Sequence, residues 1–286
     1  MTPLPAVDHR PGAPAPAAAE LAVAARGGVS RIDHLYQSQP LRLLFPRPRG
    51  GEPLTAVLAN TSGGIVGGDR LDVRIACAAE AQALASAQAA EKVYRSAGPT
   101  AAVNVSLSVE PGACLEWLPQ GTILFDRVRL RRTTELSVAA GGRLLVGEIL
   151  MFGRAAMGER LLHGMVRDAW RARYAGRLVW ADSLHLDGDL SAPLSSPAGF
   201  AEARAAGMLL YLADNAAGRL EMARDLLDRD RDDGLRAGAT AFDQMLLLRW
   251  LGRDAHAVRT AFGRFWSAFR AAVLGRPGRL PTLWRI

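Results

Sequence analysis

The chain has little lysine, little cysteine and no long hydrophobic run. Lys92 is the only lysine among 35 basic residues. Cys77 and Cys114 lie in strand-like segments without a CxxC pattern or a nearby histidine pair, which argues against a zinc site or a disulfide framework and favours buried thiols. The longest apolar runs, such as MLLYLA, are far shorter than the roughly 20 residues of a membrane-spanning helix. A cytoplasmic protein with no membrane partner is therefore expected.

Basic charge is concentrated at one end of the chain. From Arg249 onward there are eight arginines and one acid, Asp254, which equals the formal net charge of +7, so the preceding 248 residues are neutral overall. A local basic surface of this kind fits an acidic protein partner better than a nucleic-acid backbone. The alternative is a nucleic-acid-binding β protein that uses the basic C-terminal helix.

Most of the sequence alternates with the period of a β-strand. Residues 1–28 are rich in alanine and proline and predict a mobile extension. From about Ile32 to Asp187 the pattern is that of strands, as in AVNVSLSVE, where Val103, Val105, Leu107 and Val109 share one face. We expect a single domain over 29–286, with a β-rich part over 29–190 and a mixed α/β part over 191–286.

A weak internal repeat suggests how these strands are arranged. Superimposing LSVEPGACLEW on LSVAAGGRLLV matches Leu107 with Leu136, Val109 with Val138, Gly112 with Gly141 and Leu115 with Leu144, a spacing of 29 residues. A looser third copy begins at Ile75. Short repeats of strands and turns are typical of stacked coils, because each coil buries its inner face against its neighbours. The predicted fold is mainly β (α+β), with stacked, solenoid-like strands; ordinary hairpins are the alternative.

The C-terminal part adds helices. GMLLYLA is compatible with a strand, AGRLEMARDLLDRDRDD has helical spacing, and FDQMLLLRWLG fits either a strand or a helix. Over Asp254 to Leu274 an amphipathic helix is predicted, because Asp254 can cap it and the large apolar residues form one stripe. We expect the chain to end in an extended tail.

The stretch NTSGGIVGGDRL contains two glycine pairs, Gly63-Gly64 and Gly67-Gly68, followed by Asp69. It matches neither GxGxxG nor GxxxxGK[ST], and the strand-like DRLDVRIAC follows it, so nucleotide binding is not expected. The simplest interpretation is a strand–turn–strand in which glycines supply positive φ angles and close backbone approach. A functional addition is Asp69, which could make a transient cation contact.

Five blocks of sequence carry a family resemblance. NTSGGIVGGDRL, QAAEKVYRS, LPQGTILFDRVRLRR, GEILMFGRAAMGE and a terminal P-x-x-W (Pro281, Trp284) resemble, in this order, the urease accessory protein UreD family, called UreH in some bacteria. The likeness covers about residues 28–286. It implies a mainly β fold with a few helices.

The resemblance also implies a function. UreD-like proteins are not enzymes but chaperones that bind apo-urease and, through a UreF-like accessory protein, recruit a UreG-like GTPase that carries nickel. Two nickel ions are delivered to a urease site that also needs a carbamylated lysine. No tightly bound cofactor and no nucleic acid is implied, and nickel would pass only transiently.

Candidate residues for these roles lie in the family blocks and the C-terminal helix. A nickel path needs weak, serial oxygen or nitrogen ligands, and the five histidines (His9, His34, His163, His185, His256) form no HxH or HxxxH cluster. The candidate transit residues are the carboxylates Asp69, Glu91, Asp126, Glu148 and Glu159. The simpler role of each is a turn acid or a salt bridge. Glu148 is the strongest candidate, because it lies on the alternation of a buried strand.

The candidate partner interface is formed by Arg259, Arg264, Arg270 and Trp284. A solvated basic face is the simpler interpretation of these residues.

Overall fold

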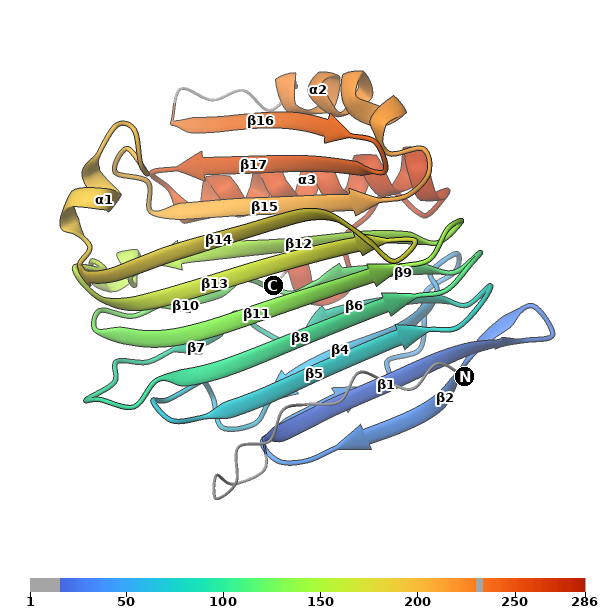
Figure 1. Cartoon of the computed structure of the whole chain (residues 1–286), viewed down its shortest axis with the longest axis horizontal. Helices are drawn as coiled ribbons and strands as arrows, with labels where there is room; N and C mark the ends of the chain where they lie inside the picture. The colour runs from blue at the N-terminus through green and yellow to red at the C-terminus, as the bar shows by residue number, and fades with distance from the viewer. Residues whose placement is uncertain (1–15, 230–233, 286) are drawn as a thin grey trace.

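Two large β-sheets pack face to face in the computed structural model, which describes residues 16–229 and 234–285. The seven-stranded sheet faces the viewer in Figure 1. Its strand order is β14-β13-β11-β8-β5-β1-β2. These strands are β1 (Ala17–Arg26), β2 (Val29–Gln37), β5 (Arg70–Cys77), β8 (Ala101–Val109), β11 (Val128–Val138), β13 (His163–Tyr174) and β14 (Arg177–Asp189).

The second sheet has ten strands and lies partly behind the first, while β15, β17 and β16 extend beyond it at the top of Figure 1. Its main order is β16-β17-β15-β12-β9-β6-β4-β3, and the short strands β7 and β10 join it through β12. The strands are β3 (Leu41–Leu44), β4 (Leu54–Asn60), β6 (Gln82–Ala87), β7 (Glu91–Val93), β9 (Cys114–Leu118), β10 (Thr122–Leu124), β12 (Arg143–Phe152), β15 (Ala205–Leu212), β16 (Leu235–Phe242) and β17 (Met245–Gly252).

The central strands form stacked coils, as the repeat predicts. Each coil places one strand in each sheet: β5 then β6, β8 then β9, β11 then β12, all parallel to their equivalents in the next coil. Leu107 pairs with Leu136 and Leu115 with Leu144, and the looser copy is also in register, since Ile75 pairs with Leu107. The solenoid-like prediction is confirmed, and the alternative of ordinary hairpins is wrong for these strands.

Glycines allow the chain to pass from one sheet to the other. Gly112 and Gly141 stand at equivalent turns with φ angles of +70° and +77°, which glycine adopts without strain. The Gly112 N–H donates to the Gly141 carbonyl at 3.2 Å, so successive turns also stack.

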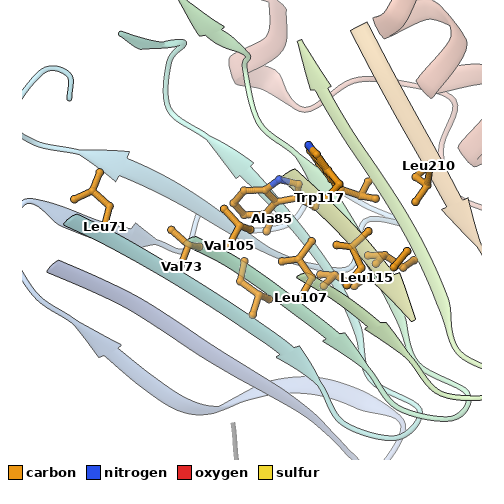
Figure 2. Close-up of a cluster of buried hydrophobic side chains, with 14 of the residues drawn as sticks. Leu71, Val73, Ala85, Val105, Leu107, Leu115, Trp117 and Leu210 are labelled. Carbon is orange, nitrogen blue, oxygen red and sulfur yellow. The ribbon is translucent and has the colours of Figure 1, made fainter. Parts of the chain in front are cut away.

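Apolar side chains from both sheets fill the space between them. In Figure 2, Val73, Val105 and Leu107 from one sheet point toward Ala85, Leu115 and Trp117 from the other. The alternation of the strands places these residues inside, and each fully buried Val or Leu contributes about 1.5–3 kcal/mol. Cys77 and Cys114 are buried free thiols, and burial raises the pKa of Cys114 to about 11.

The helices cover the far side of the ten-stranded sheet and its end. They are α1 (Ser191–Ser195), α2 (Leu220–Asp228) and α3 (Ala255–Leu274), with short 3-10 turns η1 (Ala155–Met157), η2 (Ala217–Arg219) and η3 (Thr282–Arg285). The predicted C-terminal helix is confirmed, and the Asp254 carboxylate accepts from the His256 N–H at 2.9 Å. GMLLYLA and FDQMLLLRWLG both contribute strands, β15 and β17. Among the described residues, no helix is long and apolar enough to span a membrane.

Two predictions about the chain ends are wrong. Ala17–Arg26, assigned by composition to a mobile extension, form β1, because the small inner residues Ala19 and Val23 pack against the core while the backbone pairs with β5. Residues 1–15 of that extension lie outside the described residues. The tail is not wholly extended, since η3 folds back and buries Trp284.

Candidate functional site: a cavity between the sheets

A cavity of about 300 Å³ lies between the two sheets. Its wall is largely apolar, with Leu71 and Val73 from β5, Val105 from β8, Trp117 from β9 and Trp170 from β13. An apolar interior with a few convergent polar groups is typical of a ligand site or a passage. The polar groups on its lining therefore decide what can enter.

A buried cluster of one arginine and two carboxylates forms one side of this cavity. Arg132 of β11 donates to Asp168 of β13 with Nη2–Oδ2 and Nε–Oδ1 distances of 2.6 and 3.0 Å. Its Nη1 lies 2.8 Å from Oε1 of Glu148 on β12. Thr122 Oγ1 also donates to Glu148 Oε1, at 2.8 Å. Arg132, Thr122 and Glu148 line the cavity, and Asp168 holds the guanidinium from behind.

The formal charges of this cluster do not balance. With both carboxylates ionised, one guanidinium faces two negative charges in a region where Glu148 is 8% exposed. Burial is the main cause that raises the pKa of Glu148, and the neighbouring Asp168 raises it further, while Arg132 opposes both. A buried excess charge is costly unless it is neutralised. Glu148 can therefore be neutralised by a proton or by a cation in the cavity.

Glu91 lies at another part of the same lining. It begins β7, where it pairs in register with Thr122 of β10. Asn60 Nδ2 donates to Glu91 Oε1 and Oε2 at 3.2 and 3.3 Å. Burial raises the pKa of Glu91, against the opposing effect of the Asn60 hydrogen bond. Two carboxylates with raised pKa thus lie on either side of Thr122.

The glycine-rich stretch positions Asn60. It connects β4 in one sheet with β5 in the other, so the predicted strand–turn–strand joins the two sheets. Asn60 Nδ2 also donates to the Gly64 carbonyl at 3.2 Å, and its Oδ1 accepts from the Ser62 hydroxyl at 2.6 Å. The turn therefore orients the side chain that holds Glu91.

The glycines of this turn are required for two different reasons. Gly63, Gly64 and Gly68 have positive φ angles of +79°, +155° and +94°. Gly67 does not, so the expectation of a positive φ at all four glycines is wrong there. A Cβ on Gly67 would collide with Ser96 Oγ and lie 2.7 Å from the Pro99 carbonyl oxygen, so close approach is the reason for glycine.

The other three candidate transit acids do not line the cavity. Asp69 closes its own turn by accepting from the Val66 N–H at 2.9 Å. Asp126 accepts from the N–H groups of Leu162 and His163 at 2.8 and 2.9 Å; these bonds lower its pKa although partial burial opposes them. Glu159 forms an ion pair with Arg154 at 2.8 Å. Each thus has the simpler role of a turn acid or salt bridge.

The histidines and the proposed interface residues are scattered. His34 lies 3.5 Å from Glu20, His163 and His185 are exposed, and His9 lies outside the described residues. No group of three His, Cys, Asp or Glu side chains in the described part of the chain could hold a metal ion.

The C-terminal arginines do not form one outward face. Arg270 has a side chain 1% exposed and pairs with Glu116 (Nε–Oε2, 2.7 Å) and Glu52 (Nη2–Oε2, 2.8 Å). Arg259 is half-buried and stacks 4.2 Å from the ring centroid of Trp284, which is itself buried. Of the three arginines of α3, Arg264 is the exposed one. The expectation that Arg259 and Arg270 point outward is wrong, because buried acids, carbonyls and the Trp284 ring hold them inside.

The alternation of β11 contains a sequence signal for this cluster. Arg132 and Thr134 occupy inner positions of β11, between Leu130 and Leu136 in the alternation, and both are buried. A buried guanidinium has to be paired, and a carboxylate is its most common charged partner. That the acids are Asp168 and Glu148, from two other strands in two sheets, depends on the fold.

Comparison with known proteins identifies the family of this chain. The family model of the UreD urease accessory protein matches residues 15–285. "Urease accessory protein UreD" of Magnetococcus marinus is 47% identical over 263 residues, covering 91% of each chain. "Urease accessory protein UreD 2" of Methylorubrum populi is 44% identical, covering 91% of this chain and 86% of its own. "Urease accessory protein UreD" of Rhodopseudomonas palustris strain BisA53 is 42% identical, covering 90% and 86%. The chain therefore belongs to the UreD urease accessory protein family.

Proposed function

We propose that this protein is a urease maturation chaperone that lets nickel ions pass through the cavity between its sheets. The observation that carries the proposal is the presence of Glu91 and Glu148 on the lining of one cavity. Both are partly or fully buried carboxylates with raised pKa. Of the five acids predicted for transit, these two have the geometry for the role.

The charge of the cavity favours a cation over an anion. Glu148 faces a guanidinium that Asp168 already pairs in bidentate fashion. A divalent cation at Glu148 would offset the excess negative charge and displace any proton held there. Carboxylate oxygens are acceptable nickel ligands, and one carboxylate at a time binds weakly enough to release the ion. Nickel is the cargo here and no resident cofactor is implied.

Partners follow from family membership and from the names of the relatives. We propose that the chain holds apo-urease and a UreF-like protein, through which a UreG-like GTPase supplies nickel. The chain itself acts without catalysis, as a scaffold. The cavity between its sheets would connect the protein that supplies the nickel ion with the protein that receives it.

Nickel loading in cells tests the proposal directly. The full chain, co-expressed with a urease operon, should restore nickel per urease active site and urea hydrolysis. Glu148→Gln and Glu91→Gln should each lower both severalfold, because each removes a charged oxygen ligand while keeping side-chain size. The amount of apo-urease that co-purifies should not change.

The matched control is Glu159→Gln, which removes a carboxylate outside the cavity. It should load nickel like the wild type. Wild-type nickel content in all three variants would rule out passage through this cavity. Normal loading in cells that lack the chain altogether would reject the maturation role.

The nucleic-acid alternative receives no support from the C-terminal helix. Its aromatic stripe (Phe262, Phe265, Trp266, Phe269) is buried against β15 and β17, so none of these rings is available to stack on a base.

A further inference from the structure

Basic side chains gather on the outer face of the seven-stranded sheet. Arg131 of β11 pairs in register with Arg167 of β13, which pairs with His185 of β14, and all three are exposed. Alternate residues of a strand share a face, so further arginines of β11 and β13 join this row. We call this surface the arginine face: Arg129, Arg131, Arg167, Arg171, Arg173 and His185.

The fold does little to neutralise the arginine face. The outer positions of β11, β13 and β14 between Arg129 and Asp187 include two acids, Glu135 and Asp187. The Glu135 carboxylate forms an ion pair with Arg171, at 3.1 Å. In residues 16–229 and 234–285, no carboxylate forms an ion pair with Arg131 or Arg167.

Like charges directly opposite one another destabilise a sheet. Adjacent strands are about 4.8 Å apart, so Arg131 and Arg167 repel each other without an intervening acid. Beside them, Arg129 has its Nε buried without a hydrogen-bond partner. The row thus costs the isolated fold stability, and a surface of opposite charge would remove that cost.

The arginine face is open to a large partner. The row next to Arg131 and Arg167 is Thr133, Ala169 and Ser183, whose small side chains allow close approach. The packing contacts of α2 and α3 are with strands of the other sheet, and no described helix crosses the arginine face in Figure 1.

We propose that the arginine face docks on an acidic surface of a partner protein in the urease maturation assembly. The inference rests on the proposed function and names a surface for it. Guanidinium groups pair with carboxylates through two parallel hydrogen bonds, which suits an acidic protein surface. The outer positions of β11, β13 and β14 carry no Phe, Tyr or Trp side chain for stacking on bases, so a protein is favoured over single-stranded nucleic acid.

Charge reversal in the complete assembly tests the inference. The full chain is co-expressed with the urease operon, treated with nuclease, and the captured apo-urease and accessory proteins are quantified. Arg131→Glu with Arg167→Glu should lower capture roughly tenfold or more, because like charges would face each other across the interface. Capture by the wild type should fall steeply as salt is raised.

A matched control separates the face from net charge. Arg31→Glu with Arg236→Glu makes the same change at exposed residues of the edge strands β2 and β16 and should leave capture within twofold. Arg131→Gln with Arg167→Gln should lower capture while melting no lower than the wild type, because it removes a repulsion without adding one. This variant distinguishes lost docking from lost folding.

Two results would overturn the inference: undiminished capture by the Arg131→Glu, Arg167→Glu protein, or equal loss in the Arg31→Glu, Arg236→Glu control. If the wild type restores nickel loading in either of these cases, the proposed function stands and only the docking surface fails. If the wild type neither loads nickel nor captures apo-urease, the proposed function fails and this inference fails with it.

Discussion

Two of the buried charge clusters in residues 16–229 and 234–285 differ in balance and in surroundings. Arg270 of α3, together with Arg279, faces Glu52 and Glu116, so two positive groups meet two negative ones. Arg270 Nη1 also donates to the Pro277 and Arg279 carbonyls, at 2.9 and 3.2 Å. At the cavity, Arg132 alone faces Asp168 and Glu148.

This difference indicates two different uses of buried charge. The Arg270 cluster ties the C-terminal helix and tail to β9 and to the loop at Glu52, and every charge in it has a partner. The Arg132 cluster keeps one carboxylate in excess on a cavity wall. A balanced cluster fastens parts of the fold together, whereas an unbalanced one beside a cavity can take up a proton or a cation.

Removing the centre of the balanced cluster should have the largest effect. Arg270→Ala leaves Glu116 buried without its cation, and we expect a loss of about 3–5 kcal/mol in the free energy of unfolding. Denaturant unfolding of the purified protein would measure this free energy. Arg253→Ala, which removes an exposed ion pair with Glu202 just before the same helix, should change stability by less than about 1 kcal/mol. Similar losses in both variants would contradict a fastening role for the Arg270 cluster.

A substitution in the glycine-rich turn beside the cavity should destabilise the strands around that turn and leave the C-terminal helix unaffected. Gly67→Val forces a side chain into space held by Ser96 and the Pro99 carbonyl, at a cost of about 1–3 kcal/mol or more. Hydrogen exchange should accelerate around β4, β5 and β7 while protection in α3 is kept. Gly98→Ala, where no atom lies within 4 Å of the new Cβ, is the control and should exchange like the wild type. Equal loss of protection in α3 would show that the two regions are not separable.

The smallest effect, and one that depends on pH, is expected for Glu148→Gln. The pKa of Glu148 is raised in the folded protein, so its contribution is fully present below the pKa of the unfolded carboxyl and is lost as pH rises through the folded value. Glutamine does not titrate, and its amide oxygen can still accept from Thr122 and Arg132. As pH rises above the ordinary pKa of a glutamate, stability should therefore shift in favour of the variant, by about 1.4 kcal/mol per unit of pKa shift. A stability difference that is independent of pH would show that Glu148 keeps an ordinary pKa.

Part of the candidate site was predictable because it lies within short segments. Glu148 stands on a hydrophobic alternation, which predicts its burial from β12 alone. The glycine turn was identifiable from its composition, but the need for Gly67 was not, because it arises from Ser96 and Pro99 some thirty residues later in the chain. The outward placement predicted for Arg270 failed for a similar reason: its partners Glu52 and Glu116 lie far from it in sequence.

By itself, the sequence determined the strands, the amphipathic C-terminal helix and the 29-residue repeat that stacks them, because side-chain periodicity is a local property of the backbone. Only the tertiary structure decided that Glu91 and Glu148 share a cavity, that Arg132 meets two acids from different strands, and that Arg131 and Arg167 form one exposed row. The charge balance of a cluster and the lining of a cavity depend on which strands become neighbours. The strand register in both sheets then decides which residues of those strands meet.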